Sequence, residues 1–255
     1  MKLTGYEFLT AFLVFVILMG AGTASLRFHR RLPDRYRDED TATVIRLIAS
    51  IFVVMTSLVL GLMINSAKNT FELADRNVHA MATETILLDK MLRRLGDLGD
   101  TTRQQLIAYA RYAKAASGSK SSGLVIGDVH AEMLLDRAGD ELRAIRPSSG
   151  EQMVLWQEAM AKFQRIFDLR WKLIEQADGT IKPALLFMVV AWLIVIFASV
   201  GFRAPFNMMV MGGIFVSSIL MATTIYLIID MDIPFGGPMS VSREPVDRVL
   251  LALTR

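Results

Sequence analysis

The side chains best suited to catalysis or metal binding are few in this 255-residue sequence, and their spacing fits none of the common motifs. The histidines are His29, His79 and His130. Glu84 follows His79 by five residues and Glu132 follows His130 by two, whereas helical zinc and di-iron sites place ligands about three or four residues apart. The chain has no cysteine, no glycine-rich phosphate loop and no Gly-x-Ser-x-Gly turn. We therefore expect no catalytic residue, cofactor or metal, and no enzyme.

A stripe of small and polar residues runs along one side of the second apolar block, if that block is a helix turning about 100° per residue. The stripe consists of Ser50, Ser57, Gly61 and Asn65, with Arg46 and Lys68 at its ends. One interpretation is close helix packing, because small residues let helix backbones approach within a membrane. The other is that the stripe faces a water-filled axis in an oligomer, where hydroxyl and amide groups contact ions.

An acidic segment rich in proline and glycine follows the fourth apolar block. It contains Asp230, Asp232, Pro234, Phe235 and Gly236, and then Ser242, Glu244 and Pro245. Proline and glycine interrupt helices, so we interpret this exit motif as the end of a helix, after which Ser242 caps a short amphipathic tail helix. That tail carries Val246, Val249, Leu250 and Leu253 along one side. Alternatively, Asp230 and Asp232 form an acidic ring at a pore mouth, which would favour cations.

The elements that carry these residues follow from the hydrophobic content of 53%, which exceeds the 45–50% that is about normal for soluble domains. The excess lies in four blocks, approximately 6–26, 47–66, 183–202 and 206–229, and Glu7 is their only charged residue. Each is close to the roughly 20 residues that one membrane crossing requires. We predict an all-α integral membrane protein with two membrane helices before, and two after, a polar stretch. A cleaved signal peptide is the alternative for the first block, but arginines follow it at once, as in an anchored helix.

The polar stretch, residues 67–182, has the apolar periodicity of a helical bundle. A heptad seam comprises Phe71, Ala74, Val78, Met81, Thr85, Leu88, Leu92 and Leu95. A second seam, after a cap at Ser149 or Ser148, comprises Met153, Trp156, Met160, Phe163, Phe167, Trp171 and Ile174. Two shorter helices are expected near 101–116 and 128–146, separated by a Gly/Ser-rich loop. We predict that the second membrane helix continues into the first seam, and that the four helices close into an extramembrane antiparallel bundle.

These patterns divide the chain into four parts and predict its orientation. The parts are 1–66 with an arginine-rich loop at 27–46, the bundle at 67–182, the helices at 183–230, and the exit motif with its tail at 231–255. Short loops rich in arginine stay in the cytoplasm, and the loop at 27–46 and the turn at Arg203 carry this signal. We therefore expect the bacterial inner membrane, with that loop cytoplasmic and the bundle periplasmic. Counting the flanks of the long bundle makes the charge balance nearly equal. The net charge is only +3, and the basic residues are interleaved with acidic ones, so no nucleic-acid partner is expected.

Several of these segments together resemble a known family, the bacterial bestrophin-like domain proteins of unknown function. The resemblance rests on Asp232–Gly236 with Ser242–Pro245, on Gly61-Leu62, on Phe71, Ala74, Val78, Glu84 and Leu88, and on Arg165 and Arg170 before Pro183. It covers most of residues 47–250, and the exit motif is its specific part. One departure is that no Glu-Trp-Pro-like element follows Tyr109 to Tyr112.

The resemblance implies an architecture and an assembly. True bestrophins are pentameric anion channels built from two helices, an extramembrane helical region and two further helices. By this resemblance alone the chain is expected to form a homo-oligomer, as a pentamer. The helical region of bestrophins is cytoplasmic, however, whereas the arginine loop here predicts the opposite side. Their apolar neck motif also has no match at Ile51, Phe52 and Val53.

Two functions remain open on the sequence. The favoured one is a homo-oligomeric bestrophin-like membrane protein acting as a passive ion channel, with the second membrane helix lining an axial pore. The alternative is a non-conducting membrane sensor or assembly scaffold whose bundle binds a ligand or partner protein. Stoichiometry separates them, because a monomer cannot form a pore at an oligomer axis.

Overall fold

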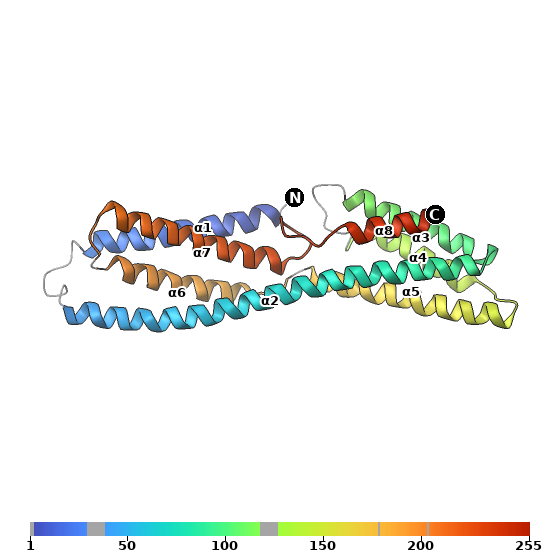
Figure 1. Cartoon of the computed structure of the whole chain (residues 1–255), viewed down its shortest axis with the longest axis horizontal. Helices are drawn as coiled ribbons and strands as arrows, with labels where there is room; N and C mark the ends of the chain where they lie inside the picture. Colours follow the sequence, from blue (N-terminus) through green and yellow to red (C-terminus); the bar gives the residue numbers. More distant parts are fainter. Residues whose placement is uncertain (1–2, 30–38, 118–126, 178, 203) are drawn as a thin grey trace. The chain divides into compact units, whose positions relative to one another are not determined.

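The computed structural model describes residues 3–29, 39–117, 127–177, 179–202 and 204–255 (Figure 1). Its helices are α1 (Leu3–His29), α2 (Glu39–Arg94), α3 (Asp97–Ser117), α4 (Val129–Ala144), α5 (Gly150–Gln176), α6 (Pro183–Gly201), α7 (Met208–Asp232) and α8 (Glu244–Thr254). No strand occurs in these ranges, so the predicted all-α class is confirmed. Residues 30–38 of the arginine-rich loop, Arg203 and most of the Gly/Ser-rich loop lie outside the described residues.

The chain folds into two compact units. The apolar unit comprises Lys2–Asn69 and Thr180–Asp232, and the bundle unit comprises Thr70–Gly179 and Ile233–Arg255. One uninterrupted helix, α2, contributes residues to both units, so the predicted continuation of the second apolar block into the heptad seam is confirmed. The C-terminal tail belongs to the bundle unit.

Within the described residues, four helices have the length and composition to cross a membrane, and the last part of one of them, α2, belongs to the bundle unit. These stretches are Gly5–Phe28, Thr43–Arg94, Pro183–Gly201 and Met208–Asp232. α1 packs against both α6 and α7, around a core that includes Leu18, Leu193 and Ile225. At Gly201 the backbones of α6 and α1 approach closely, because a Cβ atom there would lie 2.5 Å from the carbonyl oxygen of Gly22.

In the bundle unit, the first predicted seam is confirmed as a buried face of α2. Ala74, Val78, Thr85, Leu88, Leu92 and Leu95 are buried, and Phe71 and Met81 are partly buried. The same core receives the apolar side predicted for the tail helix α8, because Val246, Val249, Leu250 and Leu253 all pack into it. The helices expected near 101–116 and 128–146 correspond to α3 and α4.

The second predicted seam, on α5, is displaced from the face that the structure buries. The buried residues are Leu155, Ala159, Phe163, Ile166, Arg170 and Leu173, so only Phe163 belongs to both lines. Met153 and Trp171 are 41% and 50% exposed. Trp156 lies at the edge of the face, where its indole N–H donates to the carbonyl oxygen of Leu142 at 2.8 Å. This half-buried position suits a tryptophan, because the apolar part of the indole ring packs against the core while the ring N–H reaches a hydrogen-bond acceptor.

Both predicted serine caps receive backbone amides, although only one has the expected register. The Ser149 hydroxyl accepts from the backbone N–H of Gln152 at 3.2 Å and caps α5. The Ser242 hydroxyl accepts from the backbone N–H of Glu244 at 3.2 Å. The capping position of α8 is Arg243, however, and Pro245 lies in the first turn of the helix. The prediction that Ser242 is itself the cap is therefore displaced by one residue.

Candidate functional site

The membrane-length part of α2 has three different faces. One is buried within the chain and contains Ala49, Thr56, Leu60, Met63 and Ala67. A second is exposed and carries large apolar side chains, with Ile51 56% and Leu62 61% exposed. The third is the predicted stripe of Ser50, Ser57, Gly61 and Asn65, and all four residues are exposed. At about 100° per residue, the stripe lies roughly 120° from the buried face.

The small residues of this stripe are not used to pack helices within one chain. A Cβ atom added at Gly61 would meet nothing within 4 Å. The hydroxyls of Ser50 and Ser57 donate to carbonyl oxygens of their own helix, those of Leu47 at 2.7 Å and Val53 at 2.8 Å. The stripe is therefore available to water, lipid or another copy of the chain, and its role in a pore stays a prediction.

The two carboxylates predicted at a pore mouth both lie inside the apolar unit of the single chain. The carboxylate of Asp232 accepts hydrogen bonds from the backbone N–H groups of Thr180 at 3.0 Å and Ile181 at 2.9 Å, and from the Thr180 hydroxyl at 2.8 Å. These donors directly precede α6, so Asp232 satisfies amides beside the positive end of that helix. Asp230 is fully buried, and its side chain lies beside that of the buried Glu7 of α1.

The exit motif forms a compact turn in the bundle unit. The backbone N–H of Gly236 donates to Ile233 at 3.1 Å, and that of Val241 donates to the carbonyl oxygen of Pro234 at 3.0 Å. Gly237 has φ near 70°, a conformation that glycine adopts without strain. Phe235 packs against a small core formed by Ala74, Val78, Leu173 and Val241. The motif thus directs the chain from α7 back to the bundle core.

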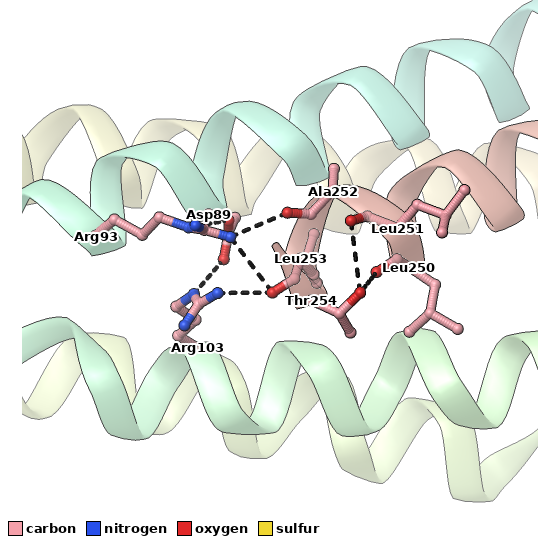
Figure 2. A network of polar contacts seen from close by, with 8 residues as sticks. All are labelled: Asp89, Arg93, Arg103, Leu250, Leu251, Ala252, Leu253 and Thr254. Carbon is pink, nitrogen blue, oxygen red and sulfur yellow. Dashed lines mark hydrogen bonds and ion pairs between the residues drawn. The ribbon is translucent and has the colours of Figure 1, made fainter.

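A polar network holds the end of the tail helix, and the sequence patterns did not indicate it (Figure 2). Asp89 of α2 is only 3% exposed, and its carboxylate accepts from Nε of Arg93 and from Nε of Arg103, each at 2.7 Å. The same guanidinium groups donate to α8 carbonyl oxygens, Arg103 to Leu253 at 2.6 Å and Arg93 to Ala252 at 3.0 Å. Cations stabilise the carbonyl end of a helix, so the network fixes α8 in place.

A second polar cluster joins α3, α4 and α5. Asp128 caps α4 by accepting from the backbone N–H groups of His130 and Ala131. The Tyr112 hydroxyl donates to the same carboxylate at 2.9 Å, and this hydrogen bond holds the pKa of Asp128 below its ordinary value. Arg170, 3% exposed, donates to the Asp128 carbonyl oxygen at 3.1 Å. A cation thus occupies the interior of the bundle unit.

Other residues that carried the resemblance also form ion pairs. Glu84 of α2 lies 2.8 Å from Nζ of Lys162 and 3.4 Å from Nη1 of Arg165, both on α5. Burial raises the pKa of Glu84, but the two cations outweigh burial and hold it below its ordinary value. Within the described ranges, no group of three or more His, Asp or Glu side chains could hold a metal ion. These clusters join helices by charge.

This architecture is similar to that of known proteins. A family model described as the Bestrophin-like domain matches residues 14–246. The chain is also similar to the crystal structure of a mutated bacterial bestrophin homologue from Klebsiella pneumoniae, with a TM-score of 0.61 at 12% sequence identity. That match covers 95% of this chain and 97% of the other. No curated protein matches the chain.

Proposed function

Because this chain belongs to the Bestrophin-like domain family, we propose that it is a homo-oligomeric membrane channel in which α2 lines an axial path. The observation that carries this proposal is the exposed stripe of Ser50, Ser57, Gly61 and Asn65 on α2. The exposed amide of Asn65 on a membrane helix needs water or a partner beside it, because hydrocarbon offers it none.

The membrane arrangement proposed is two crossings, α1 and α2, before the bundle and two, α6 and α7, after it. The supporting observation is that all four helices are long and apolar enough to span the hydrocarbon core. The arginine-rich loop at 27–46 is then cytoplasmic and the bundle periplasmic, by the charge of the short loops. In a bacterium this membrane is the inner one.

An oligomer follows from how little of α2 its own chain covers. Only one of its three faces is buried, while the apolar face, with Leu62 61% exposed, and the stripe beside it remain open. An axial position accommodates both, because the stripe then meets water while the apolar face packs against neighbouring copies. The family resemblance favours five copies.

Ser57, Gly61 and Asn65 are the proposed pore-facing residues, with Ser50 at the entrance. Their side chains are small or uncharged, which suits a passive path more than a proton-coupled transporter. Asp230 and Asp232 are proposed to act near the mouth through their charge from behind the surface, since both are buried within one chain. We propose no catalytic step for this protein.

Planar-bilayer recording of the purified protein tests conduction. Unitary currents are expected, and Asn65→Leu is expected to change their amplitude, because it replaces an amide on the stripe. Leu62→Met, on the exposed apolar face of the same helix, is the matched control and should leave the current unchanged. Native mass spectrometry should give an oligomer; a monomer would exclude an axial pore, and a silent pentamer would contradict conduction.

A non-conducting sensor or scaffold is the second candidate, favoured by the charged interior of the bundle unit. Arg170 and Asp128 form a polar cluster of the kind that can respond to a ligand. This function predicts a monomer or dimer, and a specific partner that is lost when residues 100–146 are deleted. Pull-down from cells expressing the intact and the deleted chain distinguishes it from the channel.

A further inference from the structure

A groove of about 470 Å³ lies between α2 and α6 in the apolar unit. Its α2 wall includes Arg46, Ser50 and Val53, and its α6 wall includes Ile196, Ser199 and Val200. This volume is within the range of about 300–1,000 Å³ that is typical of small-molecule sites. The groove lies in helices of membrane-spanning length, so a membrane component can reach it.

The groove is open because small residues separate the two helices at this level. Ala49, Ser50 and Ser199 leave space that larger side chains would fill. The serine hydroxyls donate to their own helices, Ser50 to Leu47 at 2.7 Å and Ser199 to Ile196 at 2.8 Å. Their donor hydrogens are therefore used, and most of the wall is apolar.

One end of the groove is cationic. Arg46 is exposed at this end. It directly precedes the apolar block at 47–66, and at 1.5 Å of rise per residue Val53 lies roughly 10 Å farther along α2. A guanidinium group at the edge of the hydrocarbon, above an apolar trough, complements an amphiphile with an anionic head.

We propose that this groove binds an anionic phospholipid, with its phosphate on Arg46 and an acyl chain between Val53 and Val200. Guanidinium pairs with phosphate through two parallel hydrogen bonds, while the acyl chain fills the space between the two helices and makes van der Waals contact with their apolar walls. The site includes Ser50, at one end of the stripe, and leaves Ser57, Gly61 and Asn65 free to face an axis. The inference requires that α2 and α6 lie in a membrane, but it does not require conduction.

Native mass spectrometry of the detergent-purified chain with equal amounts of dioleoyl-phosphatidylglycerol and dioleoyl-phosphatidylcholine tests the cationic end. The wild-type protein should retain phosphatidylglycerol in preference to phosphatidylcholine. Arg46→Gln should reduce that preference about fivefold, the effect of one basic residue near an anionic surface. Arg27→Gln, an exposed arginine at the end of α1 outside the groove, is the control and should preserve it. Equal retention of the two lipids, or equal loss in both variants, would overturn the proposal.

A pair of tryptophan variants tests the apolar walls. Val53→Trp should occupy the groove and lower retention of phosphatidylglycerol, whereas Ile51→Trp, on the exposed apolar face, should not. Glycerol phosphate, which has the head but no acyl chain, should fail to compete. If Val53→Trp instead lowers the mass of the oligomer and leaves lipid bound per chain unchanged, a second copy occupies the groove and the proposal is wrong.

Discussion

The carboxylate of Asp89 on α2 accepts a hydrogen bond of 2.7 Å from Nε of Arg103 on α3, and Arg103 in turn donates to the last turn of α8. One buried acid thus orients a cation toward the carbonyl end of a helix that is distant in sequence. Because Arg93 repeats the arrangement from the other side, the tail is held by two arginines that share one counter-ion.

Asp89→Asn should release this tail. The amide keeps the shape of the carboxylate but leaves two guanidinium groups without their counter-ion, and we expect a loss of about 2 kcal/mol in the free energy of unfolding. Asp140→Asn is the control, because its pair with Arg143 is exposed and should contribute less than about 0.5 kcal/mol. Thermal unfolding in detergent and limited proteolysis near α8 measure the two effects. Equal melting temperatures for the two variants would contradict a structural role for Asp89.

Acid should loosen the start of α4. The Tyr112 hydrogen bond lowers the pKa of Asp128, so the folded state is stabilised above the unfolded pKa of about 3.9. That contribution is lost as the pH falls below about 4 through the lower, folded pKa. Tyr112→Phe should therefore raise the pKa of Asp128 and make stability less dependent on pH below about 4. Carboxyl NMR titration measures the pKa, with Tyr6→Phe in α1 as the control; an unshifted Asp128 would refute the assignment.

Asp232 should act first as a structural residue. Asp232→Ala removes the acceptor for the three groups that precede α6, and the expected cost is about 1–2 kcal/mol in the free energy of unfolding. Lys182→Ala is the matched control, since Lys182 is the capping residue of α6 and makes no side-chain cap bond. Calorimetric or fluorescence melting distinguishes them. If Asp232→Ala changes the cation-to-anion permeability ratio without lowering the melting temperature, the carboxylate serves the mouth and not the helix.

Cysteine scanning should distinguish the faces of α2. No native thiol competes for the reagent, because the chain contains no cysteine. Ser57 and Leu62 are both exposed in the single chain. In the assembled channel, Ser57→Cys should react with a charged, membrane-impermeant methanethiosulfonate and Leu62→Cys should not, because only the stripe faces water. The rates can be measured by mass shift. Comparable reactivity at the two positions would place the stripe away from an aqueous axis.

The crossing of α1 and α6 should not tolerate a methyl group at Gly201. Gly201→Ala places a Cβ atom against the Gly22 carbonyl oxygen and the Ser25 side chain, so we expect a destabilisation of about 1–3 kcal/mol from overpacking. Gly213→Ala, on α7, meets nothing within 4 Å and should be neutral or slightly stabilising. Thermal melting of the purified variants compares them. A fully stable Gly201→Ala would mean that the two helices can separate.

Local patterns were sufficient for the helices themselves. The apolar blocks and the heptad from Phe71 to Leu95 predicted long helices, because burial on one side of a helix imposes a repeat that is visible in the sequence alone. The break at Pro234 and Gly236 was equally visible, since proline and glycine change the backbone wherever they occur. The bestrophin-like family was recognised from the same exit motif.

Contacts between side chains that are distant in sequence were decided only by the tertiary structure. On α5, two neighbouring lines of residues have the same helical spacing. Packing against other helices buried the line that contains Ala159 and Ile166, which also includes the charged Arg170. Asp232 and Thr180 are brought together by chain folding, as are Asp89 and the carbonyl of Leu253 through Arg103. The sequence by itself determined which segments are helical and which are apolar, because both follow from residues close in the chain. The tertiary structure decided what each buried charge contacts, because a charge is satisfied by whichever groups folding brings near it.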